Sequence, residues 1–351
     1  MSGWGTPLLL IVFAGGAVAT WLAGTVLSKT TDALDVRLGL GEELGGLLLL
    51  ALAGSLPEVA ITVSAAAGGH LGLAAGNLIG GIAVQTMVLL VCDAFAGDSP
   101  LSFLVGALTP VLEGLLVMIV VSGVLMGALL KETTAIGGVV SPASVAICGA
   151  WGIGLYVINR ARKAPRWHVS MPGSKPGRRH RREPIPDKPH PYAADSTARV
   201  ALLFGAACAV TLAAGVALEQ SGDALATHFG VNGVIFGATI LATASALPEI
   251  SSGIAAVRLG DNALALGAIF GGNAFQVCLF LLADLIAGKP VLPSAGHLNA
   301  WLAALGIALT AVYGFGVIIR PLRCHARLGP DSLLAATIFG LGIAGLFVVP
   351  H

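Results

Sequence analysis

The sequence predicts an all-helical membrane protein of ten transmembrane helices, arranged as two five-helix halves of opposite orientation. The composition is the first observation: 56% of residues are hydrophobic and only 11% are charged, whereas soluble domains carry about a quarter charged residues. The second is a series of long apolar runs on both sides of one hydrophilic segment. The third is a stretch of the first half that recurs in the second. Together they exclude a soluble globular protein.

The apolar runs set the expected spans, because a helix needs about 20 apolar residues to cross the hydrocarbon core. The first run lacks the basic flank of a signal peptide, so we expect it to be a retained span. The ten expected spans are 7–28, 44–67, 73–96, 102–128, 133–158, 198–218, 232–257, 263–287, 298–319 and 331–349.

One hydrophilic segment divides the chain into a first half (1–159), a linker (160–197) and a second half (198–351). Residues 160–199 hold 11 of the 19 Lys and Arg residues together with seven prolines. This composition is typical of a disordered basic linker that fixes topology. A contact with lipid headgroups or a regulatory partner is the less favoured alternative. Nucleic-acid binding is not expected, because no folded basic surface or aromatic platform accompanies the charges.

The distribution of basic residues predicts the orientation in the cell membrane. If the linker is cytoplasmic, 17 of the 19 Lys and Arg residues fall on the cytoplasmic side, as the positive-inside rule requires. Both termini are then extracytoplasmic. Because each half has an odd number of spans, the halves cross the membrane in opposite directions, an arrangement found in alternating-access transporters.

An internal repeat marks the candidate functional site. Residues 50–101 align without a gap on residues 241–292, with 20 identities in 52 positions, among them Glu58 with Glu249 and Asp93 with Asp284. An acid at membrane depth is costly and by default indicates an ion or substrate path. Asp93 and Asp284 fall near span ends, so a helix-end role is favoured for them.

The residues around Glu58 and Glu249 suit a hard cation. Each acid follows a proline, which cannot donate its backbone hydrogen bond, and Gly54 and Ser245 lie four residues earlier. Such breaks free carbonyl oxygens at membrane depth, and carboxylates and carbonyls are preferred calcium and sodium ligands. Two symmetric glutamates would suit one divalent ion. The alternative is a protonated, hydrogen-bonded pair that only locks the helices.

Gln85 and Gln276 each lie 27 residues after their glutamate, within the glycine-rich stretches 76–85 and 267–276. Their amide oxygens would complete an ion cage. The alternative is that they only link helices by hydrogen bonds, and the glycines only allow close helix approach.

The Leu-Pro-Glu segments and the glycine-rich stretches resemble the alpha repeats of the sodium/calcium exchanger family, part of the cation/calcium antiporter superfamily. The resemblance implies that Glu58 and Glu249 bind calcium or sodium in alternation. The resemblance also implies a hydroxyl ligand at Ser55 and ligands at Gln85 and Gln276, where the family has Asn or Asp. It further implies backbone oxygen ligands near Gly54 and Ser245. The implied ion-binding set is Glu58, Glu249, Gln85, Gln276, Ser55, Gly54, Ser245 and Asn273, with the two glutamates as the metal ligands.

Departures from the family pattern bear on the ions. The family's Gly-Ser-Asn is Gly80-Gly81-Ile82 in the first repeat and Gly271-Gly272-Asn273 in the second. Both serine hydroxyls are therefore missing, which weakens the case for several bound sodium ions.

The expected function is secondary antiport of Ca²⁺, or another divalent cation, for Na⁺ by alternating access. Protons are the alternative counter-ion, and a non-transporting scaffold or sensor with a degenerate site is a further alternative. A cation channel is less favoured, because broken inverted segments suit an occluding site. The sequence lacks Ser-His-Asp order, HExxH and phosphate-binding loops, so we do not expect an enzyme. The expected partners are inorganic cations and the bilayer, with no cofactor besides the transported ions.

Other polar residues are less informative. Glu113 is either a proton-accessible acid or a structural one. His70, His228 and His297 fall in expected external links and are interpreted as solvated. The five scattered cysteines indicate neither a disulfide framework nor a zinc site.

Overall fold

The computed structural model describes residues 1, 3–38, 53–163, 192, 195–292 and 296–349. Apart from two isolated bridge pairs, the regular structure in these ranges is helical. The first half contains α1 (Thr6–Leu38), α3 (Leu56–Gly68), α4 (Leu71–Ala94), α5 (Leu101–Leu104), α6 (Thr109–Ala128), η1 (Glu132–Thr134) and α7 (Pro142–Lys163). The second half contains α8 (Thr197–Phe229), α9 (Gly233–Phe236), the π-helical turn η2 (Gly237–Leu241), α10 (Ala242–Ser245), α11 (Leu247–Arg258), α12 (Asn262–Gln276), α13 (Leu279–Ala287), α14 (Gly296–Ile319) and α15 (Pro330–Gly345).

The helices confirm an all-helical membrane protein. In the described ranges, seven helical segments are long and apolar enough to cross a membrane, and the pair Gly233–Ser245 and Leu247–Arg258, bent by 46°, makes an eighth. Two shorter apolar helices, α3 and α15, match the second and tenth expected spans. Residues 44–52 of the second expected span lie outside the described residues, so the count of ten stays a prediction.

Several helices differ from their expected bounds. α1 and α8 are each 33 residues long and extend well past 28 and 218, because polar residues at a helix end can face solvent without interrupting the helix. α7 begins at Pro142 rather than at 133, since Gly137 and Gly138 adopt positive φ values of 63° and 75°, which suit a turn. Most of the expected linker, residues 164–191, lies outside the described residues.

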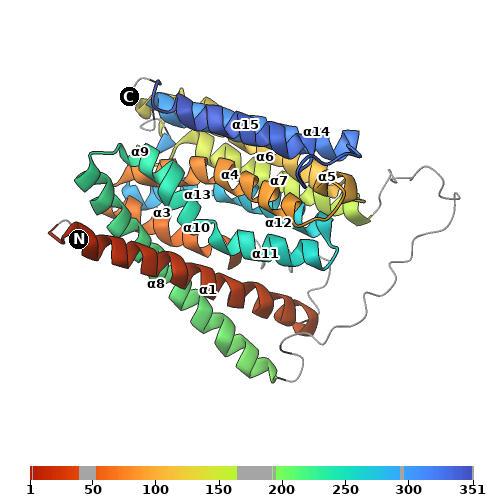
Figure 1. Cartoon of the computed structure of the whole chain (residues 1–351). Helices are drawn as coiled ribbons and strands as arrows, with labels where there is room; N and C mark the ends of the chain where they lie inside the picture. The colour runs from red at the N-terminus through yellow and green to blue at the C-terminus, as the bar shows by residue number, and fades with distance from the viewer. Residues whose placement is uncertain (2, 39–52, 164–191, 193–194, 293–295, 350–351) are drawn as a thin grey trace, which may run out of the picture.

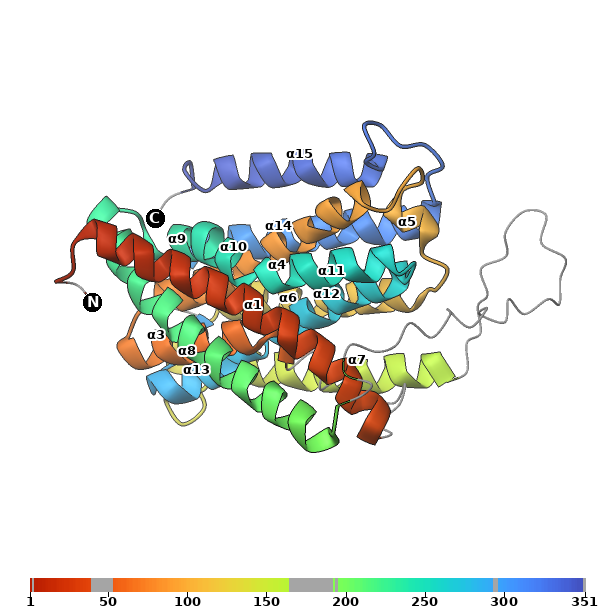
Figure 2. The ribbon, with the colours of Figure 1, turned by 60° about the horizontal axis from the view of Figure 1, so that its bottom comes forward.

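The helices run side by side along one common direction, and both ends of the chain lie at the same end of the bundle (Figure 1). α7 and α11 finish at the opposite end, where they carry basic residues in their last turns. Figure 2 shows α1 and α8 next to each other on one side of the molecule, with α15 on the far side. α1 and α8 therefore flank the rest of the bundle.

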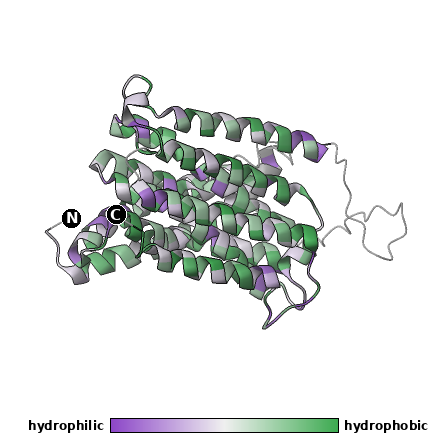
Figure 3. Cartoon of the chain, turned by 90° about the horizontal axis from the view of Figure 1, so that it is seen from above, coloured by the Kyte–Doolittle hydropathy of each residue, from purple (hydrophilic) through white to green (hydrophobic). Residues whose placement is uncertain are grey.

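The centre of the bundle is built around α4, whose buried face spans nearly its whole length. Residues of α4, α6, α12 and α14 form the largest apolar core, which includes Leu78, Ile82, Phe270 and Leu309. Hydrophobic residues also cover the outer helical surfaces, whereas hydrophilic residues gather toward helix ends (Figure 3). Exposed side chains such as Leu22, at 61%, suit lipid contact.

Asp93 and Asp284 act at helix ends, as their sequence positions favour. Asp93 accepts hydrogen bonds from the backbone N–H groups of Leu101 and Gly329, both at 2.6 Å. Asp284 accepts from Val291 at 2.7 Å and Ser141 at 2.9 Å. Gly329 and Ser141 directly precede the prolines that begin α15 and α7. The two aspartates thus fix equivalent loops in the two halves.

Candidate cation-binding site

Two helix breaks position the paired glutamates. α3 begins after Ser55, and α11 begins after Ala246, so each Leu-Pro-Glu triplet opens a new helix. Proline suits this first turn because its missing N–H would have no helical partner there. Glu58 and Glu249 consequently lie in the first turns of α3 and α11, where the helix dipole favours negative charge.

Glu58 is fully buried and held by both halves of the chain. Its Oε1 accepts a hydrogen bond from Nε2 of Gln85 on α4 at 2.9 Å. Ser245, at the end of α10, lies beside the same carboxylate, and its hydroxyl donates to the carbonyl oxygen of Ala242 at 3.2 Å. Glu58 and Gln85 of the first half and Ser245 of the second half therefore meet at one point.

Glu249 lies close enough to Glu58 for the two carboxylates to interact electrostatically. Its Oε2 is buried and has no hydrogen-bond partner among the described residues, and Oε2 of Glu58 is in the same situation. Two ionised carboxylates in one buried site repel each other. A cation or a proton between them would relieve that repulsion, which is the chemistry expected of an exchange site.

Gln276 and Asn273 on α12 contact α4 instead of Glu249. Nε2 of Gln276 donates to the carbonyl oxygens of Leu78 at 2.8 Å and Asn77 at 3.3 Å. Nδ2 of Asn273 donates to Oγ1 of Thr86 at 3.1 Å, while its Oδ1 is buried without a described partner. The amides of α12 thus bind the two central helices together, and the two glutamines are not equivalent.

The glycines at the two missing serine positions differ in the space around them. A Cβ atom placed on Gly81 would lie 2.3 Å from Nε2 of Gln276, far inside contact distance. A Cβ on Gly272 would lie 4.0 Å from Oε1 of Gln85, an ordinary contact. Gln276 therefore fills the space that a side chain at 81 would need, whereas position 272 retains room.

Gly54 and Ser55 border the first break. Ser55 is buried, with φ −89° and ψ 9°, and its side chain makes no capping hydrogen bond. Its carbonyl accepts a hydrogen bond from N of Val59 at 3.0 Å. Gly54 is exposed, with open space where a Cβ would lie. Gly54 thus lies on an open side of the break, and Ser55 on its buried side.

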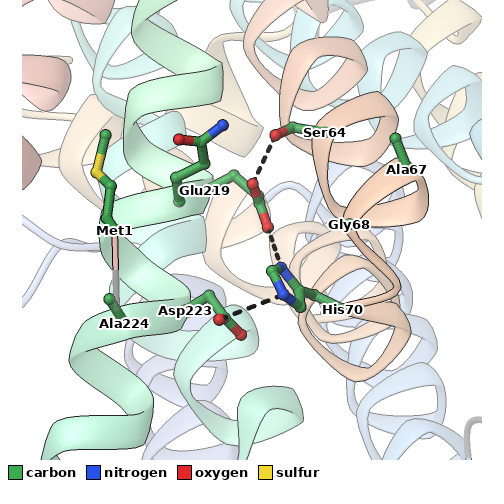
Figure 4. Close-up of a pocket in the computed structure, with 9 residues that line it drawn as sticks. Met1, Ser64, Ala67, Gly68, His70, Glu219, Asp223 and Ala224 are labelled. Carbon is green, nitrogen blue, oxygen red and sulfur yellow. Dashed lines mark hydrogen bonds and ion pairs between the residues drawn. The ribbon is translucent and has the colours of Figure 1, made fainter. Parts of the chain in front are cut away.

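A second acidic cluster was missed in the sequence (Figure 4). Glu219 of α8 is buried and accepts a hydrogen bond from Oγ of Ser64 at 2.6 Å, and its Oε1 lies 2.8 Å from Nδ1 of His70. Nε2 of His70 lies 3.4 Å from Asp223. These residues line a cavity of about 530 Å³.

The interpretation of His70 as a solvated residue is wrong, because the extended α8 brings two carboxylates to it. The sixth span was expected to stop at 218, one residue before Glu219. Continuing the helical pattern through Asp223 would have found both acids. His228 contacts Oγ1 of Thr6 at 3.3 Å, and His297 is exposed.

Glu113 pairs with a basic residue at the end of α7. Its Oε1 lies 3.7 Å from the guanidinium of Arg162, and its Oε2 is buried and close to Gly267 of α12. Arg162 lies next to the basic linker, so this acid is held near one end of the bundle. The structure gives it a charged partner that the sequence could not indicate.

Two curated proteins are similar to this chain in sequence. The chain is 26% identical over 287 residues to a protein of Alkalimonas amylolytica named as an antiporter, CaxA, covering 82% of each chain. It is 26% identical over 294 residues to the inner membrane protein YrbG of Escherichia coli K12, covering 83% of this chain and 79% of that protein.

Solved structures share the fold. The H⁺/Ca²⁺ exchanger CAX superposes with a TM-score of 0.69 at 15% identity, over 98% of this chain and 82% of that one. The sodium-calcium exchanger NCX_Mj gives a TM-score of 0.61 at 13% identity, over 99% and 100%. The model of the family described as sodium/calcium exchanger protein matches residues 8–160 and 199–349. This chain therefore belongs to the sodium/calcium exchanger family, a family of membrane cation antiporters.

Proposed function

We propose that the protein exchanges Ca²⁺, or another divalent cation, for a monovalent cation by alternating access, with Glu58 and Glu249 as the central ligands. The observation that carries the proposal is the meeting of two carboxylates from two separate helix breaks, each with one buried oxygen that lacks a described partner. Two negative charges balance one divalent ion, and carboxylate oxygens are ligands that Ca²⁺ prefers. Competition between that ion and the counter-ions for the same carboxylates then couples their movements.

Further oxygens would come from residues around the breaks. Gln85 already bonds Glu58, Ser245 lies beside that carboxylate, and Asn273 has an amide oxygen without a described partner. We include Ser55, Gly54 and Gln276 as more distant members of the set. Gln276 needs a rotation away from the carbonyls of α4 to act as a ligand.

Sodium is the counter-ion that the family resemblance suggests, but the packing around Gly81 favours protons. Sodium needs several oxygen ligands, but the amide of Gln276 occupies the place of one missing serine. A proton needs only a carboxylate. We therefore expect proton coupling to be the stronger of the two.

We also propose the topology on which alternating access depends. The two segments that match the family model, 8–160 and 199–349, support a division into halves at residues 1–159 and 198–351 with a linker between them. The basic ends of α7 and α11 at one end of the bundle support a cytoplasmic linker. Both termini would then be extracytoplasmic.

Ion flux in proteoliposomes tests the function. Ca²⁺ uptake should follow an imposed pH gradient, and a Na⁺ gradient applied at constant pH measures the sodium alternative. Glu58→Gln and Glu249→Gln should each abolish uptake. If neither gradient drives Ca²⁺ flux, antiport is contradicted and the scaffold or sensor alternative is favoured. Flux that survives both substitutions would contradict the site.

A further inference from the structure

The first helix of each half carries the same pattern of a threonine and a glycine four residues apart. Thr20 and Gly24 lie on α1, and Thr211 and Gly215 lie on α8, at the same 191-residue offset that relates Glu58 to Glu249. Residues four apart share one face of a helix. The internal repeat therefore extends to α1 and α8, which carry none of the residues assigned to the site so far.

The two glycines bring each helix against the acidic segment of the opposite half. A Cβ on Gly24 would lie 2.5 Å from Cβ of Pro248, which precedes Glu249. A Cβ on Gly215 would lie 2.5 Å from Cβ of Ala60 and 3.0 Å from the carbonyl oxygen of Pro57. Only glycine permits this approach, so one face of each helix is pressed against a Leu-Pro-Glu segment.

The threonines on these faces have unsatisfied hydroxyls. Thr20 and Thr211 are both 0% exposed, and neither Oγ1 has a hydrogen-bond partner among the described residues. Several other helical threonines donate to the carbonyl four residues earlier, as Thr30 and Thr310 do at 2.8 Å. Thr31 and Thr62 also lack a described partner, but neither has a threonine at the equivalent position of the other half. A buried polar group without a partner is unfavourable, so a symmetric pair of them requires an explanation.

The contacts of α8 place Thr211 at the level of the first helix break. Gly215 lies against Pro57 and Ala60, and Glu219, one turn later, bonds Ser64. The two helices therefore advance in the same direction, and Thr211, one turn before Gly215, lies level with the residues just before Pro57. These are the residues at which the helix breaks. The equivalent contact of Gly24 with Pro248 puts Thr20 within one turn of the second Leu-Pro-Glu segment.

We propose that Thr20 and Thr211 supply two hydroxyl oxygens to the transported divalent cation, or to water in its shell, at the two helix breaks. They would compensate for the serine hydroxyls missing at Gly81 and Gly272, and would make α1 and α8 part of the ion path. Hydroxyl oxygens are suitable ligands for hard cations. This inference rests on the proposed divalent-cation exchange and assigns further ligands to it.

Substitution with valine tests the pair, because valine keeps the shape of threonine and removes only the hydroxyl. Thr20→Val and Thr211→Val should each weaken Ca²⁺ binding by about 2- to 10-fold, and the double variant by more. The readouts are the Kd from calorimetry in detergent and the KM of uptake in proteoliposomes. Thr20→Ser and Thr211→Ser should retain wild-type affinity.

Thr30→Val is the matched control, since Thr30 is equally buried on α1 but its hydroxyl is satisfied within the helix. Its Ca²⁺ affinity should equal that of the wild type. If a valine variant unfolds early, the comparison of Ser with Ala at the same positions replaces it. Unchanged Ca²⁺ affinity in the double valine variant, with binding lost in Glu58→Gln, would overturn this inference alone. Absence of Ca²⁺ binding by the wild type would overturn the proposed function and this inference with it.

Discussion

The two Leu-Pro-Glu segments are related by the repeat, yet their acids have different surroundings. Glu58 is fully buried and receives a hydrogen bond from the amide of Gln85, with Ser245 beside it. Glu249 is half-buried, and the glutamine at the equivalent distance, Gln276, bonds the backbone of α4 instead. The helix breaks of the two halves are therefore equivalent, whereas the hydrogen bonds around Glu58 and Glu249 are not. We infer that Glu58 is the anchored acid and that Glu249 depends more on a bound cation or proton.

Removal of either acid should have the largest effect. Glu58→Gln and Glu249→Gln should weaken Ca²⁺ binding roughly 100-fold or more, because each leaves a buried ion with an uncompensated charge. The rise in unfolding temperature on adding Ca²⁺ should disappear in both variants. Without Ca²⁺, both should unfold at or above the wild-type temperature, since one of two like charges is gone. Early unfolding of Glu249→Gln would indicate a structural lock instead of an ion site.

Substitution of serine for Gly81 and for Gly272 should affect the stability of the protein differently. Gly81→Ser should lower the free energy of unfolding by about 1–3 kcal/mol through overpacking against Gln276, whereas Gly272→Ser should be close to neutral. Adding Gln276→Asn to Gly81→Ser should recover most of the loss, because the shorter amide vacates the space. Chemical unfolding in detergent measures all three. Equal effects at both glycines would contradict the packing difference.

The two glutamines should affect different properties. Gln85→Ala removes the donor to Glu58 and should change the Ca²⁺ affinity of transport by about 10-fold, as for hydrogen bonds to charged groups. Gln276→Ala removes hydrogen bonds to Leu78 and Asn77, so it should mainly lower stability, by about 1 kcal/mol. Transport KM and unfolding curves distinguish the two outcomes. A larger shift in KM for Gln276→Ala would reverse the assignment.

A smaller difference lies at the start of the glycine-rich helices. In the first half His70 precedes α4 and contacts Glu219, whereas in the second half Asp261 caps α12 by accepting from N of Leu264 at 3.1 Å. Glu219→Ala should destabilise the protein by about 1–3 kcal/mol, because it leaves Ser64 and His70 without their acceptor. Asp223→Asn, at a half-exposed position 3.4 Å from His70, should have a smaller effect on the unfolding curve.

Much of the architecture could be predicted from the sequence because apolar length and the repeat of Pro57-Glu58 in Pro248-Glu249 are local signals. The helix breaks, the buried position of Glu58 and the helix-end roles of Asp93 and Asp284 all follow from them. Helix bounds were less predictable, since α8 continues through Glu219 and Asp223 into a polar cluster.

The partners of individual side chains could not be predicted, because they depend on how the two halves pack. The turn of Gln276 toward Leu78 follows from its contact with Gly81 across the interface between halves. The pairing of Glu113 with Arg162 joins residues 49 positions apart with no repeat counterpart to indicate it. The buried faces of Thr20 and Thr211 depend on close contact at Gly24 and Gly215, which composition does not reveal.

Calorimetric titration of Ca²⁺ into the purified protein in detergent tests the cation site at Glu58 and Glu249 most directly. We expect saturable binding of one Ca²⁺ per chain, and loss of that binding in the Glu58→Gln/Glu249→Gln double variant. Glu219→Gln and Glu113→Gln, which change acids elsewhere in the fold, should keep it. Binding that persists in the double variant, or that disappears in either control, would contradict a cation site at the paired glutamates.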